Sequence, residues 1–202
     1  MTPPQPAAPT QPFALHAWVD ESMRVDPDDH GTYILASVVC DASACEPVRD
    51  LLRSLLHGRE PRLHWRDEDS RRRTKIAAAI GTFDMAAVVV IGVPMTKRRQ
   101  ERARRICMET LMPALEDLGV TRVFLEARTP SLMTKDRQQV ANLVGRKLIS
   151  KNLRVASARP LDEPMLWVPD AVAGAVGSAC DGDGQWLDLM RHTVTLLDVE
   201  LR

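Results

Sequence analysis

The sequence predicts a single α/β domain, residues 13–202, with a mixed five-stranded sheet flanked by helices. Its 202 residues fit one domain. Two apolar segments near the start are joined by a short acidic turn, which is typical of an antiparallel strand pair. After them, strand-like apolar segments alternate with helical patterns, as expected of an α/β sheet.

The five strands are predicted from runs of β-branched and alternating apolar residues. The first alternates apolar side chains and leads directly into Asp20-Glu21-Ser22. The third is a nearly continuous Val/Ile run, as expected of a strand buried on both faces. The predicted strands span residues 13–19, 32–40, 85–93, 120–126 and 153–158.

The helices are predicted from apolar residues at spacings of three and four, together with capping residues. Asp41 or Ser43 is expected to cap the first helix, Ser70 is expected to cap the second, and Thr96 is expected to cap the long third helix. Pro113 lies inside the third helix and should cause a kink or an interruption. The predicted helices span residues 46–57, 70–82, 96–118, 131–150, 165–180 and 186–190. The final segment, 194–201, fits either a helix or an edge strand.

The proline-rich start, MTPPQPAAPTQP, is predicted to lie outside the domain. Proline removes backbone donors and blocks regular structure, and this uncharged segment has too little apolar surface to bury. We therefore expect residues 1–12 to be disordered or polyproline-like.

Composition and charge are those of an ordinary globular protein, with 45% apolar residues, 27% charged residues and a net charge of zero. The charges are nevertheless segregated, with acids in 20–29 and 67–69 and bases in 71–75 and 97–105. Such segregation fits a phosphate-facing surface beside a metal site, but it fits solvated helix faces equally well. Charge alone therefore neither requires nor excludes a nucleic-acid partner.

The cysteines and the apolar runs exclude several classes of protein. Cys40, Cys45, Cys107 and Cys180 form no C-x-x-C pair and have no short spacing to histidine, so neither a zinc site nor a disulfide framework is indicated. The longest apolar run, 85–95, is too short to span a bilayer, and the N-terminus lacks the features of a signal peptide. We expect a cytoplasmic protein that has no membrane partner, and the oligomeric state stays open.

Three acids fall at the ends of predicted elements: Asp20, Glu126 and Asp170. An ionised group next to a buried strand needs a partner, and carboxylates are the ligands that Mg²⁺ and Mn²⁺ prefer. Strand ends that share one edge of a sheet are also where α/β folds place their sites. The alternative is that each strand simply ends in a solvated acidic turn.

The helix that carries Asp170 has small residues along one face. Asp170, Gly174 and Gly177 share that face, which would let the helix approach the sheet closely. Pro169 fits the first helical position, so Asp170 is predicted to lie in the first turn, where the helix dipole favours an anion.

Three other residues are weaker candidates for the same site. If the first strand continues, Glu21 should point to the opposite face from Asp20. Glu109 of the long helix could be a fourth ligand, but an exposed helix acid is the simpler interpretation. His64 fits a metal or phosphate contact, but a histidine beside Trp65 is more often a packed loop residue.

The segments WVDES, VTRVFLEAR and LWVPDAVAGAVG resemble a family of uncharacterised bacterial proteins, a domain of unknown function in the ribonuclease-H-like superfamily. The resemblance extends from about residue 13 to residue 180. It implies a ribonuclease-H-like fold in which Asp20, Glu126 and Asp170 are both the metal ligands and the catalytic residues, with Mg²⁺ or Mn²⁺ as cofactor. Two such cations about 4 Å apart stabilise the attacking and leaving oxygens of a phosphodiester.

The activity that the resemblance implies is that of a metal-dependent nuclease, or a related phosphoryl-transfer enzyme, acting on DNA or RNA. Basic residues of the long helix would then contact phosphate, namely Arg98, Arg99, Arg102 and Arg105. The first alternative is an inactive ribonuclease-H-like module that binds nucleic acid or a protein. The second is a structural domain in which the acids merely end strands.

Overall fold

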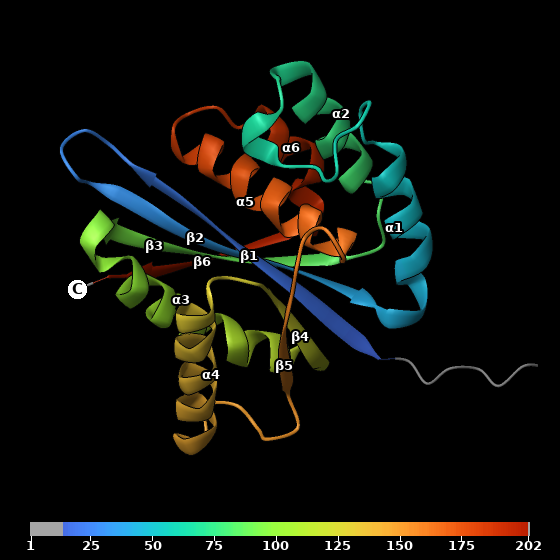
Figure 1. Ribbon diagram of the computed structural model, residues 1–202. Helices are drawn as coiled ribbons and strands as arrows, with labels where there is room; N and C mark the ends of the chain where they lie inside the picture. Colours follow the sequence, from blue (N-terminus) through green and yellow to red (C-terminus); the bar gives the residue numbers. More distant parts are fainter. Residues whose placement is uncertain (1–13, 202) are drawn as a thin grey trace, which may run out of the picture.

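The computed structural model describes residues 14–201, so the predicted tail, 1–12, lies outside the described residues. These residues form a single α/β domain (Figure 1). Its strands are β1 (Leu15–Val25), β2 (Gly31–Asp41), β3 (Ala86–Met95), β4 (Val120–Glu126), β5 (Arg154–Ala158) and β6 (Val194–Glu200). Its α-helices are α1 (Cys45–Ser54), α2 (Ser70–Ile80), α3 (Gln100–Asp117), α4 (Pro130–Gly145), α5 (Trp167–Cys180) and α6 (Gln185–Met190).

The strands form one mixed sheet in the order β5-β4-β1-β2-β3-β6. Helices α1, α2, α5 and α6 cover one face, and α3 and α4 cover the other (Figure 1). The predicted fold class is confirmed, but the sheet has six strands instead of five. The extra strand is β6, which pairs parallel with β3 from Ala87↔Val194 to Val93↔Glu200. The segment for which the sequence allowed either a helix or an edge strand is therefore an edge strand. No helix among residues 14–201 is long and apolar enough to cross a membrane.

Strand β1 is longer than the sequence pattern predicts. It pairs antiparallel with β2 along its whole length, from Leu15↔Asp41 to Val25↔Gly31, which confirms the predicted hairpin. Its parallel pairing with β4 stops earlier, at Val19↔Leu125. The prediction that the strand ends at Asp20 is therefore wrong, because β2 continues to supply backbone partners after β4 has ended.

The sheet separates two apolar cores, and β1 contributes to both. Trp18 packs in the core under α1, α2, α5 and α6, and Val19 packs in the core under α3 and α4. Because side chains alternate along a strand, Asp20 follows Trp18 toward α5, and Glu21 follows Val19 toward α3. Because of this alternation, Glu21 meets side chains of α3 and Asp20 meets side chains near α5.

Three helix starts differ from the predicted caps. Asp41 caps a 3-10 turn, η1 (Ala42–Ala44), and α1 begins only after Ala44, which makes no capping hydrogen bond with its side chain. Asp69, instead of Ser70, caps α2, and its side chain accepts a hydrogen bond from the backbone N–H of Arg72. Thr96 makes no capping hydrogen bond with its side chain, because Lys97–Arg99 form a 3-10 turn, η3, and α3 begins only at Gln100.

Two prolines also differ from their predicted roles. Pro113 lies inside α3 and does not interrupt it. A 3-10 turn, η4 (Pro164–Leu166), precedes α5, so Pro169 is the third residue of that helix and not the first. Asp170 still lies in the first turn, as predicted.

The glycines of α5 make room for side chains and not for the backbone of the sheet. A Cβ on Gly174 would lie 2.0 Å from Cδ1 of Trp65, and one on Gly177 would lie 2.4 Å from Nε of Arg24. Trp65 belongs to the 3-10 turn η2 (Trp65–Asp67), so Gly174 fixes the segment before α2 against α5.

We expect Gly174→Ala to destabilise the fold by about 1–3 kcal/mol, because the added methyl overlaps the Trp65 indole. Gly145→Ala is the matched control: a Cβ there meets no heavy atom within 4 Å, so the variant should be neutral or about 0.4–1 kcal/mol more stable. Urea unfolding measures both. Equal stability of the two variants would contradict the packing of Trp65 on Gly174.

Candidate active site

The three predicted acids line one pocket of about 180 Å³. Asp20 lies in the middle of β1, and Glu126 is the last residue of β4. They are neighbours because each follows one member of the last parallel pair, Val19↔Leu125. Asp170 reaches the same pocket from the first turn of α5. The structure thus brings together residues that come from three separate elements.

Asp20 is the most buried of these acids, with 9% of its surface exposed. Burial raises the pKa of the Asp20 carboxyl well above its ordinary value of 3.8, and the nearby Glu126 and Asp170 carboxyls raise it further. A hydrogen bond to Glu126 acts in the same direction, and the positive charge of Arg104 opposes it. These effects favour the protonated form of Asp20 more than in an exposed aspartate.

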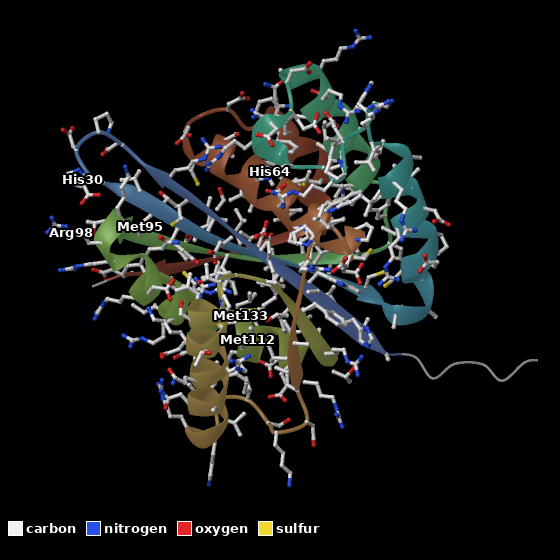
Figure 2. The ribbon with its side chains drawn as sticks, viewed as in Figure 1. His30, His64, Met95, Arg98, Met112 and Met133 are labelled. Atoms are coloured by element: carbon white, nitrogen blue, oxygen red, sulfur yellow. The ribbon has the colours of Figure 1, made fainter. Side chains whose placement is uncertain are left out.

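Asp170 is held by the segment that precedes α2. The backbone N–H of Trp65 donates to Asp170 Oδ2 at 2.8 Å, and His64 Nδ1 lies 3.2 Å from the same oxygen. This hydrogen bond raises the pKa of His64 above its ordinary value. His64, beside α5 in Figure 2, is thus part of the pocket wall and not only a packed loop residue. No local pattern marks it, since its partner lies 106 positions away.

The other face of β1 carries a dense network of ion pairs. Arg104 of α3 donates to Glu21, which also accepts a hydrogen bond from Tyr33 at 2.7 Å. Arg104 is 2.9 Å from Asp136 of α4. Glu21 lies toward α3, as the strand alternation predicts, and its negative charge is compensated.

Arg128 completes this network. Its guanidinium is 2.7 Å from Asp136 and 2.7 Å from Glu101. Both arginines that line the pocket from this side are therefore already paired with other acids. Within residues 14–201, Asp20 and Glu126 have no ion pair of their own, so this part of the pocket has an excess of negative charge.

The carboxylates are not arranged as a finished metal site. Among the described residues, no group of three or more His, Cys, Asp and Glu side chains is placed so that it could hold a metal ion as it stands. Asp170 Oδ2 is bound by the backbone N–H of Trp65 and lies beside His64, and Oδ1 of Asp20 accepts the backbone N–H of Glu21. Ligation by all three would require these side chains to rotate.

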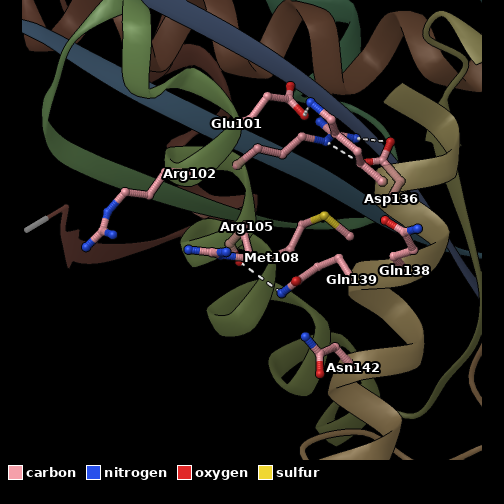
Figure 3. Close-up of a pocket in the computed structure, with 10 residues that line it drawn as sticks. Glu101, Arg102, Arg105, Met108, Asp136, Gln138, Gln139 and Asn142 are labelled. Atoms are coloured by element: carbon pink, nitrogen blue, oxygen red, sulfur yellow. Dashed lines mark hydrogen bonds and ion pairs between the residues drawn. The ribbon is translucent and has the colours of Figure 1, made fainter. Parts of the chain in front are cut away.

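The predicted phosphate-contacting arginines lie elsewhere. Arg98 and Arg99 belong to η3 ahead of α3, and Figure 2 shows Arg98 well apart from His64. Arg102 and Arg105 line a second hollow of about 340 Å³ between α3 and α4 (Figure 3). All four are exposed, but they do not line the carboxylate pocket.

Glu109, the predicted alternative for a fourth ligand, faces α4 instead of the pocket. It is 2.9 Å from Arg146 and accepts a weak hydrogen bond from Gln139. It does not line the carboxylate pocket.

Comparisons with solved structures show what this fold is similar to. A chain in the structure of the PCNA:RNase HII complex from Archaeoglobus fulgidus has 14% sequence identity and a TM-score of 0.50, with 82% of this chain and 73% of that chain covered. Ribonuclease H2 from Pyrococcus horikoshii OT3 has 13% identity and a TM-score of 0.49, with 82% and 72% covered. At this identity the first likeness shows a ribonuclease-H-like fold and no more.

No protein-family model matches the chain. No curated protein matches it either. The resemblance to a bacterial family of unknown function therefore stays a prediction, and so do the roles of the three acids.

Because the pKa of Asp20 is raised in the folded protein, its contribution to stability is fully present below the ordinary pKa. It is lost as pH rises from about 3.8 through the folded pKa. In metal-free buffer, we expect Asp20→Asn to become more stable than the wild type across this window, and the difference should shrink on acidification. Urea unfolding over a pH series measures it.

Asp50→Asn, which removes an exposed acid of α1, is the control for the loss of one negative charge. An Asp20→Asn variant that is less stable than the wild type at neutral pH and equal to it in acid would contradict the raised pKa.

Proposed function

We propose that the protein is a Mg²⁺- or Mn²⁺-dependent nuclease, or a related phosphoryl-transfer enzyme, acting on DNA or RNA. Asp20, Glu126 and Asp170 would be its metal ligands and catalytic residues. One observation carries the proposal: three carboxylates from separate elements line one pocket, while Arg104 and Arg128 are paired with other acids. Among residues 14–201, Asp20 and Glu126 have no ion-pair partner, and a divalent cation bound there would compensate their charge.

The chemistry of the donor set fits such a cation. All three side chains offer oxygen ligands, which Mg²⁺ and Mn²⁺ prefer over nitrogen and sulfur. Divalent ions bound there would stabilise the charge that develops on the attacking and leaving oxygens of a phosphodiester. Because burial and neighbouring acids raise the pKa of Asp20, cation binding displaces its proton and should be weaker in acid.

Each acid has a distinct structural support. Asp20 is fixed by strand pairing with β2 on one side, and its Oδ1 accepts the backbone N–H of Glu21 at 2.7 Å. Glu126 is the last residue of β4, and Asp170 is oriented by His64 and Trp65. Such support is what holds ligands in place for phosphoryl transfer.

The likeness to ribonuclease HII adds support, because that protein bears the name of a nuclease and has the same fold at low identity. Fold alone does not set function, so the proposal depends on the site. The arginines Arg98, Arg99, Arg102 and Arg105 remain a proposed surface for the phosphates of a longer nucleic acid, since all four are exposed beside one another in sequence.

We expect the wild type to cleave DNA or RNA only with Mg²⁺ or Mn²⁺, and Asp20→Asn and Glu126→Gln to lose activity by roughly 100-fold or more. Even the loss of an outer-shell partner of a metal ligand commonly costs 10–100-fold. Cleavage of labelled single- and double-stranded DNA, RNA and hybrid oligonucleotides measures this. Glu109→Gln makes the same chemical change outside the pocket and should retain wild-type activity.

Metal binding is measured separately from activity. Mg²⁺ or Mn²⁺ should raise the melting temperature of the wild type by mass action, and the rise should be smaller in Asp20→Asn. A metal-dependent rise without cleavage of any oligonucleotide would favour the inactive binding module. Equal activity of Glu126→Gln and Glu109→Gln would contradict the proposed site.

A further inference from the structure

Arg62 is the one cation of the carboxylate pocket whose side chain has no hydrogen bond or ion pair among the described residues. The other arginines of the pocket, Arg104 and Arg128, are bound to Glu21, Asp136 and Glu101. Arg62 is half-buried. A bound anion would stabilise a guanidinium that is partly removed from water, and none of the acids in residues 14–201 forms an ion pair with Arg62.

Arg62 and the acids of the pocket come from different elements. Asp20, Glu126 and Asp170 belong to β1, β4 and α5. Arg62 comes from the segment between α1 and α2, two residues before His64, whose side chain it affects electrostatically. Trp65, packed against Gly174, anchors this segment on α5. The lining of the pocket thus combines three acids with a cation that forms no ion pair among residues 14–201.

This arrangement matches the two sides of a phosphodiester. Divalent cations bound to the acids would contact one part of the phosphate, and Arg62 in the same lining could bind another of its oxygens. The planar guanidinium presents paired N–H donors that fit phosphate oxygens, so arginine is preferred where a phosphate must be both held and oriented.

We propose that Arg62 binds a backbone phosphate of the nucleic acid directly and positions it over the carboxylates, an inference that rests on the proposed nuclease function. Arg62 would then contribute to substrate binding and alignment, but not to metal binding. In a protein without a phosphate substrate, Arg62 would instead be an ordinary surface charge, and its replacement would affect nothing beyond general electrostatics.

The test compares Arg62→Gln with Arg66→Gln, each in the Asp20→Asn background so that cleavage does not disturb the binding measurement. Arg66 is exposed, lies in the same segment and does not line the pocket. The probes are labelled DNA, RNA and hybrid oligonucleotides with 5′-hydroxyl ends, so that only backbone phosphates are offered. Fluorescence anisotropy in Mg²⁺ gives the affinity over a series of salt concentrations.

We expect Arg62→Gln to weaken binding roughly 10- to 100-fold, as for the loss of hydrogen bonds to a charged group. It should also reduce the slope of log affinity against log salt by about one, the value for one lost phosphate contact. Arg66→Gln should change affinity far less, and Arg62→Lys should restore part of it. In the otherwise wild-type protein, the rise in melting temperature with Mg²⁺ should be unchanged by Arg62→Gln.

Equal losses in Arg62→Gln and Arg66→Gln would overturn the inference, as would the absence of binding to every probe. Normal affinity together with normal cleavage in Arg62→Gln would overturn it while leaving the nuclease function standing. An Arg62-dependent affinity in a protein that cleaves nothing would support the phosphate contact and reject the nuclease function.

Discussion

The candidate site depends on where the parallel pairing of β1 with β4 stops. The last pair, Val19↔Leu125, leaves Asp20 and Glu126 as neighbours at the point where β4 ends. Because β1 continues along β2 to Val25, the backbone of Asp20 stays fixed within the sheet and does not fray into a loop. Asp20 is thereby held beside Glu126 in a place that little water reaches, and burial disfavours the charged form of Asp20.

Strand alternation then gives adjacent acids opposite surroundings. Glu21 points to the α3 side, where Arg104 compensates its charge in a buried network with Asp136. Asp20 points to the α5 side, where among residues 14–201 it has no ion-pair partner. Breaking a buried ion pair on the first side would leave an uncompensated charge, which typically costs about 3–5 kcal/mol. The network therefore keeps its arginines on one side of β1 and leaves the acids on the other available for a cation.

Much of this organisation is predictable from the sequence, because it follows from local periodicity. Patterns within single elements predict the bounds of β4 and the first-turn position of Asp170. The short acidic turn between two strand patterns predicts the hairpin. The length of β1 is not predictable in this way, because it depends on how far β2 accompanies it. Residues 194–200 form a strand because they pair with the edge of β3, and their own sequence does not show that this edge is available.

The residues that sequence reasoning missed or ranked low have partners far along the chain. His64 meets Asp170 across 106 positions, through a contact that Gly174 permits by making room for Trp65. Arg104 belongs to a basic run that is typical of a solvated helix face, yet only 5% of its side chain is exposed. In both cases, tertiary packing and not local pattern decides the role of the side chain.

A crystal structure of the protein soaked with Mn²⁺ tests the central claim most directly, because anomalous scattering locates the ion without reference to activity. We expect an anomalous peak in the pocket within about 2.0–2.3 Å of carboxylate oxygens from Asp20, Glu126 and Asp170, with Asp170 turned away from His64. A crystal saturated with Mn²⁺ that has no peak among these three carboxylates, with Asp170 still bound to His64 and Trp65, would contradict a metal site there.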